Sequence, residues 1–225
     1  MIAFSNTEIT KAYLGSTEID KIYLGEDLVF GGSPTPVVPY DAQVEYLLGD
    51  GSIYINTGIK AAGNIQIKAH LIDFFSTTYY GKWPFGGRNG SNNKMFGFYI
   101  NGNNGKAVFA YNSRATEYSV YSTYPSTCDV EIGNGVIKIG AYTYTYSSTS
   151  FTSSYNIILF GLQNGATALP MAVKIGSVYI TNGTTTLDLI PVRVGQVGYM
   201  YDKISGNLLS NSGSGTFILG NDVMT

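Results

Sequence analysis

Alternating apolar and polar residues, in short runs separated by turn-forming residues, fill most of the chain after residue 40. A period of two points successive side chains to opposite faces, as in a β-strand that is buried on one face. Asn-Gly, the strongest short-range hairpin signal, separates several of these runs, and no window has the period of an amphipathic helix. We expect strands near residues 44–48, 53–57, 65–75, 95–100, 107–111, 116–120, 129–132, 136–141, 155–161, 171–180, 185–192, 198–201 and 216–219. So many short strands predict an all-β antiparallel sandwich or jelly roll over residues 40–225.

The first thirty residues contain a repeat of period ten. TEITKAYLGS at 7–16 is followed by TEIDKIYLGE at 17–26, with seven of ten positions identical, and then by a truncated copy, DLVFGG. Ten residues fit one strand and a tight turn. The repeat therefore predicts a small N-terminal β-meander, with strands at 2–4, 9–14, 19–24 and 28–30 and turns at 15–16 and 25–26.

Alternation along this meander puts apolar residues on both of its faces. The residues concerned are Ile9, Tyr13, Leu14, Ile19, Ile22, Tyr23 and Leu24. A short ribbon without a core is marginal in water and presents unpaired edges. Two interpretations follow: a sheet extension of the next domain, or an anchor that docks on another protein. A single domain lying beneath cannot cover both faces, so the second interpretation predicts an oligomer or a complex.

A proline-rich segment, GGSPTPVVP at 31–39, separates the repeat from the rest of the chain. Three prolines and two glycines in nine residues forbid a helix or a central strand and favour extended polyproline II. The predicted organisation is a β repeat at 1–33, a semi-rigid linker at 34–39 and one β domain at 40–225.

The composition narrows the possible partners. Thirteen basic and 15 acidic residues give a formal net charge of −2, and the basic residues form no stripe that could neutralise a nucleic acid backbone. The first residues lack a basic region followed by an apolar run, and nowhere do about 18 apolar residues occur in succession. We therefore expect no nucleic acid partner, no export signal and no membrane insertion.

Residues that could carry catalysis are few. A glycosidase needs two carboxylates at ~5–10 Å, and the nearest pattern, Asp129 and Glu131, is better explained as the solvated face of a strand. His70, the only histidine, falls on the polar face of its run, so we expect a surface residue. Cys128, the only cysteine, has no metal-ligand spacing and is expected to be a small buried residue. We expect no enzyme, no metal and no cofactor.

One segment has the composition of a carbohydrate-binding surface. Sugars present apolar faces and hydroxyl rims, so their sites combine an aromatic platform with polar partners, and Trp83, Arg88 and Asn89 supply these types. The alternative is that Trp83 is a packing residue of a strand. Three alternating tyrosines, Tyr142, Tyr144 and Tyr146, are expected to pack across strands rather than to form a platform.

Two stretches of the domain carry a resemblance. VEYLLGDGSIYINTGIK at 44–60 and LIPVRVGQVGYMYDKISGNLLSNSGSGTF at 189–217 resemble the opening and closing strands of concanavalin A-like, laminin-G-like jelly rolls of gut-bacterial surface proteins and their phages. The match covers both ends of the domain and not its middle. In the closing stretch we expect Arg193 and Asp202 to form an ion pair that organises the corner.

The decapeptide repeat resembles N-terminal repeats of structural proteins in tailed phages of gut bacteria, the crAss-like group included. The two resemblances together imply a non-enzymatic structural protein at the virion surface, a capsid or tail fibre or decoration protein, that displays a lectin-like domain for adhesion. Its partners would be other virion proteins and host-surface glycans, and analogy with fibre-like attachments suggests a homotrimer. The alternatives are a bacterial cell-surface carbohydrate-binding module and, more remotely, a glycoside hydrolase.

Overall fold

The computed structural model describes residues 12–19, 21–24, 27–31, 38–90 and 93–223. The chain divides into two compact units, Met1–Val38 and Pro39–Thr225, and the boundary falls inside the predicted linker. The fold is all-β. The described helices are two short 3-10 turns, η1 (Thr77–Tyr79) and η2 (Tyr121–Thr123), and none of the described helices is long and apolar enough to cross a membrane.

The small unit contains two hairpins among its described residues. The first joins β1 (Ala12–Leu14) to β2 (Thr17–Ile19) through the predicted turn at Gly15 and Ser16. The second joins β3 (Lys21–Leu24) to β4 (Asp27–Gly31).

The prediction of one continuous strand at 19–24 is wrong. Ile19 pairs back with Ala12, whereas Ile22 pairs with Phe30, so the described strands form two separate two-stranded sheets. The first hairpin thus joins the end of one copy of the repeat to the start of the next. The expected strand at 2–4, the turn at 25–26 and Ile9 lie outside the described residues.

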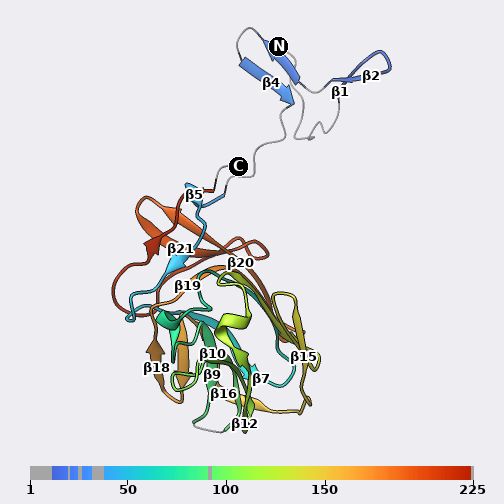
Figure 1. The fold of residues 1–225 in the computed structure, drawn as a ribbon. Helices are drawn as coiled ribbons and strands as arrows, with labels where there is room; N and C mark the ends of the chain where they lie inside the picture. Colours follow the sequence, from blue (N-terminus) through green and yellow to red (C-terminus); the bar gives the residue numbers. More distant parts are fainter. Residues whose placement is uncertain (1–11, 20, 25–26, 32–37, 91–92, 224–225) are drawn as a thin grey trace. The chain divides into compact units, whose positions relative to one another are not determined.

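The larger unit, Pro39–Thr225, consists of two sheets (Figure 1). We call the first the eight-stranded sheet. Its main path is β12 (Arg114–Val120), β11 (Lys106–Asn112), β10 (Met95–Ile100), β9 (Phe85–Arg88), β16 (Thr152–Leu159) and β7 (Ile55–Ala62), and the hairpin of β17 (Gly161–Asn164) and β18 (Thr167–Pro170) joins it at β9. All its pairings are antiparallel except that of β17 with β9.

The second sheet is antiparallel and is called the eleven-stranded sheet. Its main path is β15 (Tyr142–Thr145), β14 (Val136–Ile139), β13 (Cys128–Gly133), β8 (Gln66–Leu71), β19 (Lys174–Thr181), β20 (Thr186–Val194), β21 (Val197–Asp202) and β22 (Leu208–Leu209). Three short strands complete it: β5 (Ala42–Gln43), β6 (Leu47–Leu48) and β23 (Ile218–Leu219). Thus β6, near the start of the domain, pairs with β23, its last described strand.

The core consists of the inward-facing residues of both sheets. In β8 and β13 burial alternates strictly, with Ile67 and Val130 inside and Lys68 and Glu131 outside. The eight-stranded sheet contributes fully buried aromatic rings: Phe85, Phe96, Phe98 and Phe109. The result is a β-sandwich of two antiparallel sheets, as the alternation predicts.

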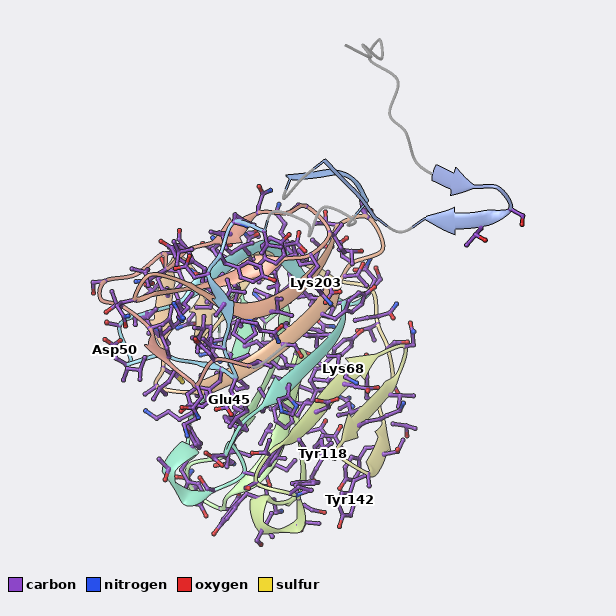
Figure 2. All side chains as sticks on the ribbon, turned by 90° about the horizontal axis from the view of Figure 1, so that it is seen from above. Glu45, Asp50, Lys68, Tyr118, Tyr142 and Lys203 are labelled. Atoms are coloured by element: carbon purple, nitrogen blue, oxygen red, sulfur yellow. The ribbon has the colours of Figure 1, made fainter. Side chains whose placement is uncertain are left out.

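Tyrosines connect the sheets where the edge strands β12 and β15 meet. The rings of Tyr118 and Tyr144 lie 4.6 Å apart, and the hydroxyl oxygens of Tyr144 and Tyr124 are separated by 2.9 Å. Tyr146 packs on Phe109, and Tyr142, which is 41% exposed, packs edge-on against Tyr124 (Figure 2). The predicted packing role of the alternating tyrosines is confirmed.

The predicted pairing of Arg193 with Asp202 is wrong. Arg193 lies opposite Gly198 in the β20–β21 ladder, whereas Asp202 lies opposite Leu189, four positions before Arg193 in β20. Arg193 instead donates two hydrogen bonds, of 2.7 and 2.6 Å, to the carboxylate of Asp222. Asp202 is buried and accepts its hydrogen bonds from the turn that follows β21 and from the backbone N–H of Asp188.

Candidate functional site

A row of polar side chains crosses the outer face of the eleven-stranded sheet. Strand register places Tyr179 of β19 beside Lys68 of β8, Lys68 beside Glu131 of β13, and Glu131 beside Lys138 of β14. Lys68 Nζ lies 3.1 Å from Glu131 Oε1, and Lys138 Nζ lies 3.3 Å from Glu131 Oε2. Lys68 also reaches Asp129, with Nζ 2.8 Å from Oδ2. The carboxylate of Glu131 is thus held between two ammonium groups.

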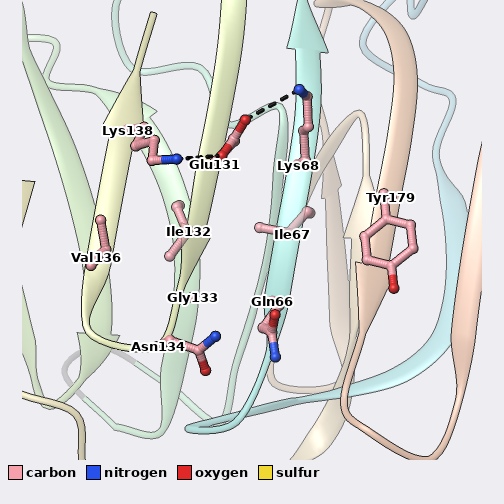
Figure 3. Close-up of a pocket in the computed structure, with 10 residues that line it drawn as sticks. All are labelled: Gln66, Ile67, Lys68, Glu131, Ile132, Gly133, Asn134, Val136, Lys138 and Tyr179. Atoms are coloured by element: carbon pink, nitrogen blue, oxygen red, sulfur yellow. Dashed lines mark hydrogen bonds and ion pairs between the residues drawn. The ribbon is translucent and has the colours of Figure 1, made fainter. Parts of the chain in front are cut away.

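A groove of about 390 Å³ lies beside this row (Figure 3). Tyr179 stands at one side and Val136 at the other, the ion pairs of Lys68, Glu131 and Lys138 close one end, and Gln66 and Asn134 lie at the opposite end. We call this site the outer groove. Its lining consists of the seven residues just named and of Ile67, Ile132 and Gly133.

The local sequence shapes the end of the groove at Gln66 and Asn134. Gly133, which carries no side chain, is the last residue of β13, and an added Cβ would lie 2.8 Å from Cγ of Gln66. The chain then turns through Asn134, which has a φ of +52°, and Gly135, with a φ of +78°. These two residues suit the left-handed conformations of a tight hairpin turn. The side chain of Gln66 therefore occupies the place that a side chain at residue 133 would take.

The pKa shifts of Lys68, Asp129 and Glu131 all favour their charged forms. Hydrogen bonds to Asp129 and Glu131 raise the pKa of Lys68, and the bond from Lys68, with a further one from Lys138, lowers the pKa of Glu131. Burial raises the pKa of Asp129, but hydrogen bonds with Lys68 and His70 outweigh it and leave that pKa below its usual value. Two lysines balance two carboxylates, so this surface carries no net charge.

This arrangement is unfavourable for glycoside hydrolysis. One carboxyl of a catalytic pair has to be protonated near neutral pH to act as general acid, which requires a raised pKa. The pKa values of Asp129 and Glu131 are instead lowered, and both groups are ion-paired with Lys68. Among the described residues, no group of three or more His, Cys, Asp or Glu side chains could hold a metal ion.

His70 and Cys128 lie as the sequence predicts. His70 is on the outer face of β8, with 39% of its side chain exposed and its Nδ1 2.7 Å from Asp129 Oδ1. Cys128 is buried as a free thiol, and burial, with a smaller contribution from Asp129, raises its pKa to about 11. A thiol with so high a pKa is a poor nucleophile at neutral pH.

Trp83 is a packing residue in this structure. Only 9% of its surface is exposed, and its ring stacks on Tyr99 with centroids 4.1 Å apart. It belongs to a second buried cluster, with Met95, Ala110 and Leu162, on the outer side of the eight-stranded sheet. Too little of the ring is exposed for a sugar to stack on it, so the packing alternative describes the observed geometry.

Arg88 and Asn89 are close to Trp83 in sequence, but their side chains form hydrogen bonds with different residues. Arg88 lies over the indole, with Cζ 5.9 Å from the ring centroid, and its Nε donates to Asn164 Oδ1 at 2.9 Å. Asn89 Oδ1 accepts hydrogen bonds from Ser153 Oγ and from the backbone N–H of Ser154. Both side chains connect neighbouring strands, and a ligand contact through either one stays a prediction.

Glycines provide the space that Trp83 occupies. Gly97 of β10 lies opposite Gly86 of β9, and a Cβ added at Gly97 would lie 2.9 Å from both Trp83 Cζ3 and the Cα of Gly86. The backbone cannot move aside as the end of a side chain can. We therefore expect Gly97→Ala to lower the free energy of unfolding by about 1–3 kcal/mol, measured from the urea dependence of Trp83 fluorescence.

A glycine in open surroundings serves as the control for this substitution. Gly102 is exposed, and its nearest neighbour would be 3.6 Å from an added Cβ, an ordinary contact. Gly102→Ala should change the stability by less than about 0.5 kcal/mol. Equal effects of the two substitutions would contradict the packing role of Gly97.

The outer groove was not predicted from the sequence. The alternation in β19 does place Tyr179 outward, and the same pattern applies to Lys68, Glu131 and Lys138 in their own strands. What the pattern does not contain is the order of strands, which brings β8 between β13 and β19. Comparison of the chain with protein-family models, curated proteins and solved structures gave no match in any of the three.

Proposed function

We propose that this chain is a non-enzymatic virion structural protein, a fibre or decoration protein of a phage capsid or tail. It is attached through residues 1–33 and displays a concanavalin A-like jelly roll at the virion surface for adhesion to host glycans. Homo-oligomerisation, with a trimer as the favoured state, and docking on another virion protein belong to the same proposal.

The observation that carries this proposal is the division of the chain into a small unit of repeat hairpins and a β-sandwich with its own core. Isolated two-stranded hairpins are marginally stable in water. The hairpins therefore need a partner, and the sandwich does not, because every described member of its main core lies between Val44 and Phe217. A chain that joins marginally stable hairpins to a stable domain suits attachment through the first and display of the second.

The jelly-roll type is supported by the strand connections. Long excursions separate paired strands: β6 pairs with β19 and β23, and β7 pairs with β16. Jelly rolls and related sandwiches join their strands through such non-local pairings rather than through hairpins alone.

Non-enzymatic adhesion is supported by the outer groove. It is open and combines an exposed aromatic ring with amide and charged groups, and Glu131 and the neighbouring Asp129 balance its two lysines. Glu131, which lines it, and the neighbouring Asp129 have lowered pKa values. These properties suit binding better than acid catalysis.

Deletion of residues 1–33 tests the attachment. We expect the protein lacking 1–33 to be soluble and folded, because the sandwich core is untouched, and to be lost from particles purified from cells that produce them. Immunoblots of purified particles measure the incorporation. The control is full-length protein with Val120→Ala, a change of a half-exposed residue in the sandwich, which should be incorporated as the wild type is.

Normal incorporation of the truncated protein would contradict the anchoring role. A bacterial cell-surface carbohydrate-binding module would then be the better explanation of a stable sandwich with an open groove. Truncated protein that is unfolded in solution would contradict the claim that the sandwich is an independent unit.

A further inference from the structure

We infer that the outer groove binds a neutral oligosaccharide, with Tyr179 as the platform for a sugar ring and the bridged Lys68–Glu131–Lys138 row as the partner of its hydroxyl groups. The inference rests on the adhesion part of the proposed function and adds to it a site and a class of ligand. It is independent of virion attachment.

The first argument is the aromatic ring. Tyr179 is 43% exposed and lies at the side of the groove, whereas Trp83 is 9% exposed and covered by other side chains. An exposed tyrosine on a rigid central strand presents a flat apolar surface at low entropic cost, and pyranose rings have apolar C–H faces that pack on such surfaces. Val136, half-buried on the opposite side, offers a second apolar contact.

The second argument is the arrangement of donors and acceptors. Lysine supplies only donors and a carboxylate only acceptors, so Lys68, Glu131 and Lys138 alternate as donor, acceptor and donor across three neighbouring strands. Adjacent hydroxyl groups of a sugar, each both donor and acceptor, match such a sequence. Gln66 and Asn134 supply amides, which are donors and acceptors at once, at the other end of the groove.

Contacts within the sheet hold these charged side chains in fixed positions. The side chains of Lys68 and Lys138 are 51% and 52% exposed, yet both are held at Glu131 by hydrogen-bond distances. A ligand therefore meets oriented groups and does not have to order them.

The third argument excludes other classes of ligand. The groove lies over β19, β8, β13 and β14, which are paired on both sides, so their backbone groups are occupied and a peptide cannot add as a further strand. Asp129 and Glu131 balance Lys68 and Lys138, so the surface has no excess positive charge to attract sialylated or phosphorylated sugars. A volume of about 390 Å³ lies within the range of small-ligand sites and suits one or two sugar residues.

The test uses the full-length protein and a panel of neutral hexose and N-acetylhexosamine oligosaccharides, with sialylated and phosphorylated glycans as the charged comparison. Array binding identifies the glycan and titration calorimetry or NMR measures its affinity. We expect binding of a neutral glycan at millimolar concentration or below, and we expect Tyr179→Ala to weaken it by about tenfold or more. Glu131→Gln should weaken the same glycan by removing the acceptor that both lysines hold.

Tyr142→Ala is the matched control, because Tyr142 is 41% exposed in the same sheet and does not line the groove. It should leave the affinity within about twofold, and urea unfolding should show that all three variants are folded under the conditions of the binding measurement. Absence of neutral-glycan binding at millimolar concentration, a preference for charged glycans, or equal losses with Tyr142→Ala and Tyr179→Ala would each overturn the inference. None of these results affects the incorporation of the protein into particles, so the two proposals fail separately.

Discussion

Replacing Asp202 by alanine should lower the free energy of unfolding of the sandwich by about 3 kcal/mol. Asp202 is 1% exposed and accepts four hydrogen bonds. One oxygen accepts from the backbone N–H groups of Asp188 and Ile204, at 2.9 and 3.2 Å, and the other from the N–H and hydroxyl of Ser205, at 3.1 and 2.6 Å. Alanine leaves all four donors without that partner. Urea denaturation followed by the fluorescence of Trp83, the only tryptophan, measures the sandwich alone.

The control for this change is Asp222→Ala. Asp222 is bonded to Arg193 but its side chain is 49% exposed, so the loss of stability should be much smaller than at Asp202. A loss at Asp222 as large as that at Asp202 would contradict the assignment of Asp202 as the residue that organises this corner.

The same carboxylate predicts a dependence on pH. Burial raises the pKa of Asp202, but the hydrogen bonds from Ser205 and from the backbone N–H groups outweigh it, and the pKa in the folded protein is lowered. A lowered pKa in the folded state stabilises the protein above the unfolded value of about 4, and this contribution is lost as the pH falls through the folded value. Asp202→Asn, which cannot ionise, should therefore lose less stability than the wild type between about pH 6 and pH 3.

The largest loss is expected for Phe98→Ala, at about 3–5 kcal/mol. Phe98 is fully buried on the inner face of β10, and its ring lies 6.2 to 6.4 Å from those of Phe74, Phe75 and Phe85. Truncation removes the contacts of the ring with all three and leaves a cavity between the sheets that rigid strands close only in part. The midpoint of urea unfolding, at an unchanged slope, is the measurement.

Two further substitutions provide controls for the expected loss of stability. Phe98→Leu keeps much of the volume and should cost less than half as much as alanine. Val120→Ala, at a position that is 41% exposed on the edge strand β12, should stay within about 0.5 kcal/mol of the wild type. A small effect of Phe98→Ala would mean that the sheets move together to fill the space.

The sequence predicted most of the longer strands but missed β9, β15 and β18. Burial alternates along β8 and β13 as the pattern requires, because each has one face in the core. β9 contains Gly86 and Gly87, which resemble a turn in sequence. In the structure the backbone of β16 approaches so closely that a Cβ at Gly87 would lie 2.5 Å from the carbonyl oxygen of Asn156. These glycines serve close packing of strands, which a single sequence does not distinguish from a bend.

The sequence also failed to predict a buried reversal of the chain direction at Phe160. We expected one strand at 155–161, but β16 ends at Leu159, and Phe160 adopts a φ of +61° before β17 begins at Gly161. A fully buried phenylalanine is rarely found in this conformation, which glycine or asparagine usually adopts. Tertiary packing against Phe217, 4.7 Å away between ring centroids, overrides the local preference.

The candidate site could be predicted from the sequence only in part. Periodicity places Lys68, Glu131 and Tyr179 on outer faces, and that part of the site is readable from the sequence. Their proximity depends on the pairing of β8 with both β13 and β19, strands that are distant in sequence. The prediction of Trp83 as a platform relied on residue type alone, and burial decides whether an aromatic ring is available.

The pairing of β6, near the start of the sandwich, with its last described strand, β23, sets the timing of its folding. β6 pairs with β19 and β23, so the backbone of Leu48 cannot form these pairs until Lys174 and Ile218 have been synthesised. At about 5–20 residues per second, a ribosome needs roughly 10–30 s to deliver the last of these partners. During that time the apolar segment around Val44 and Leu47, fully buried in the finished domain, is exposed to chaperones and to other nascent chains. Closure is therefore a late, non-local event, and such a topology folds on the millisecond-to-second scale rather than in microseconds.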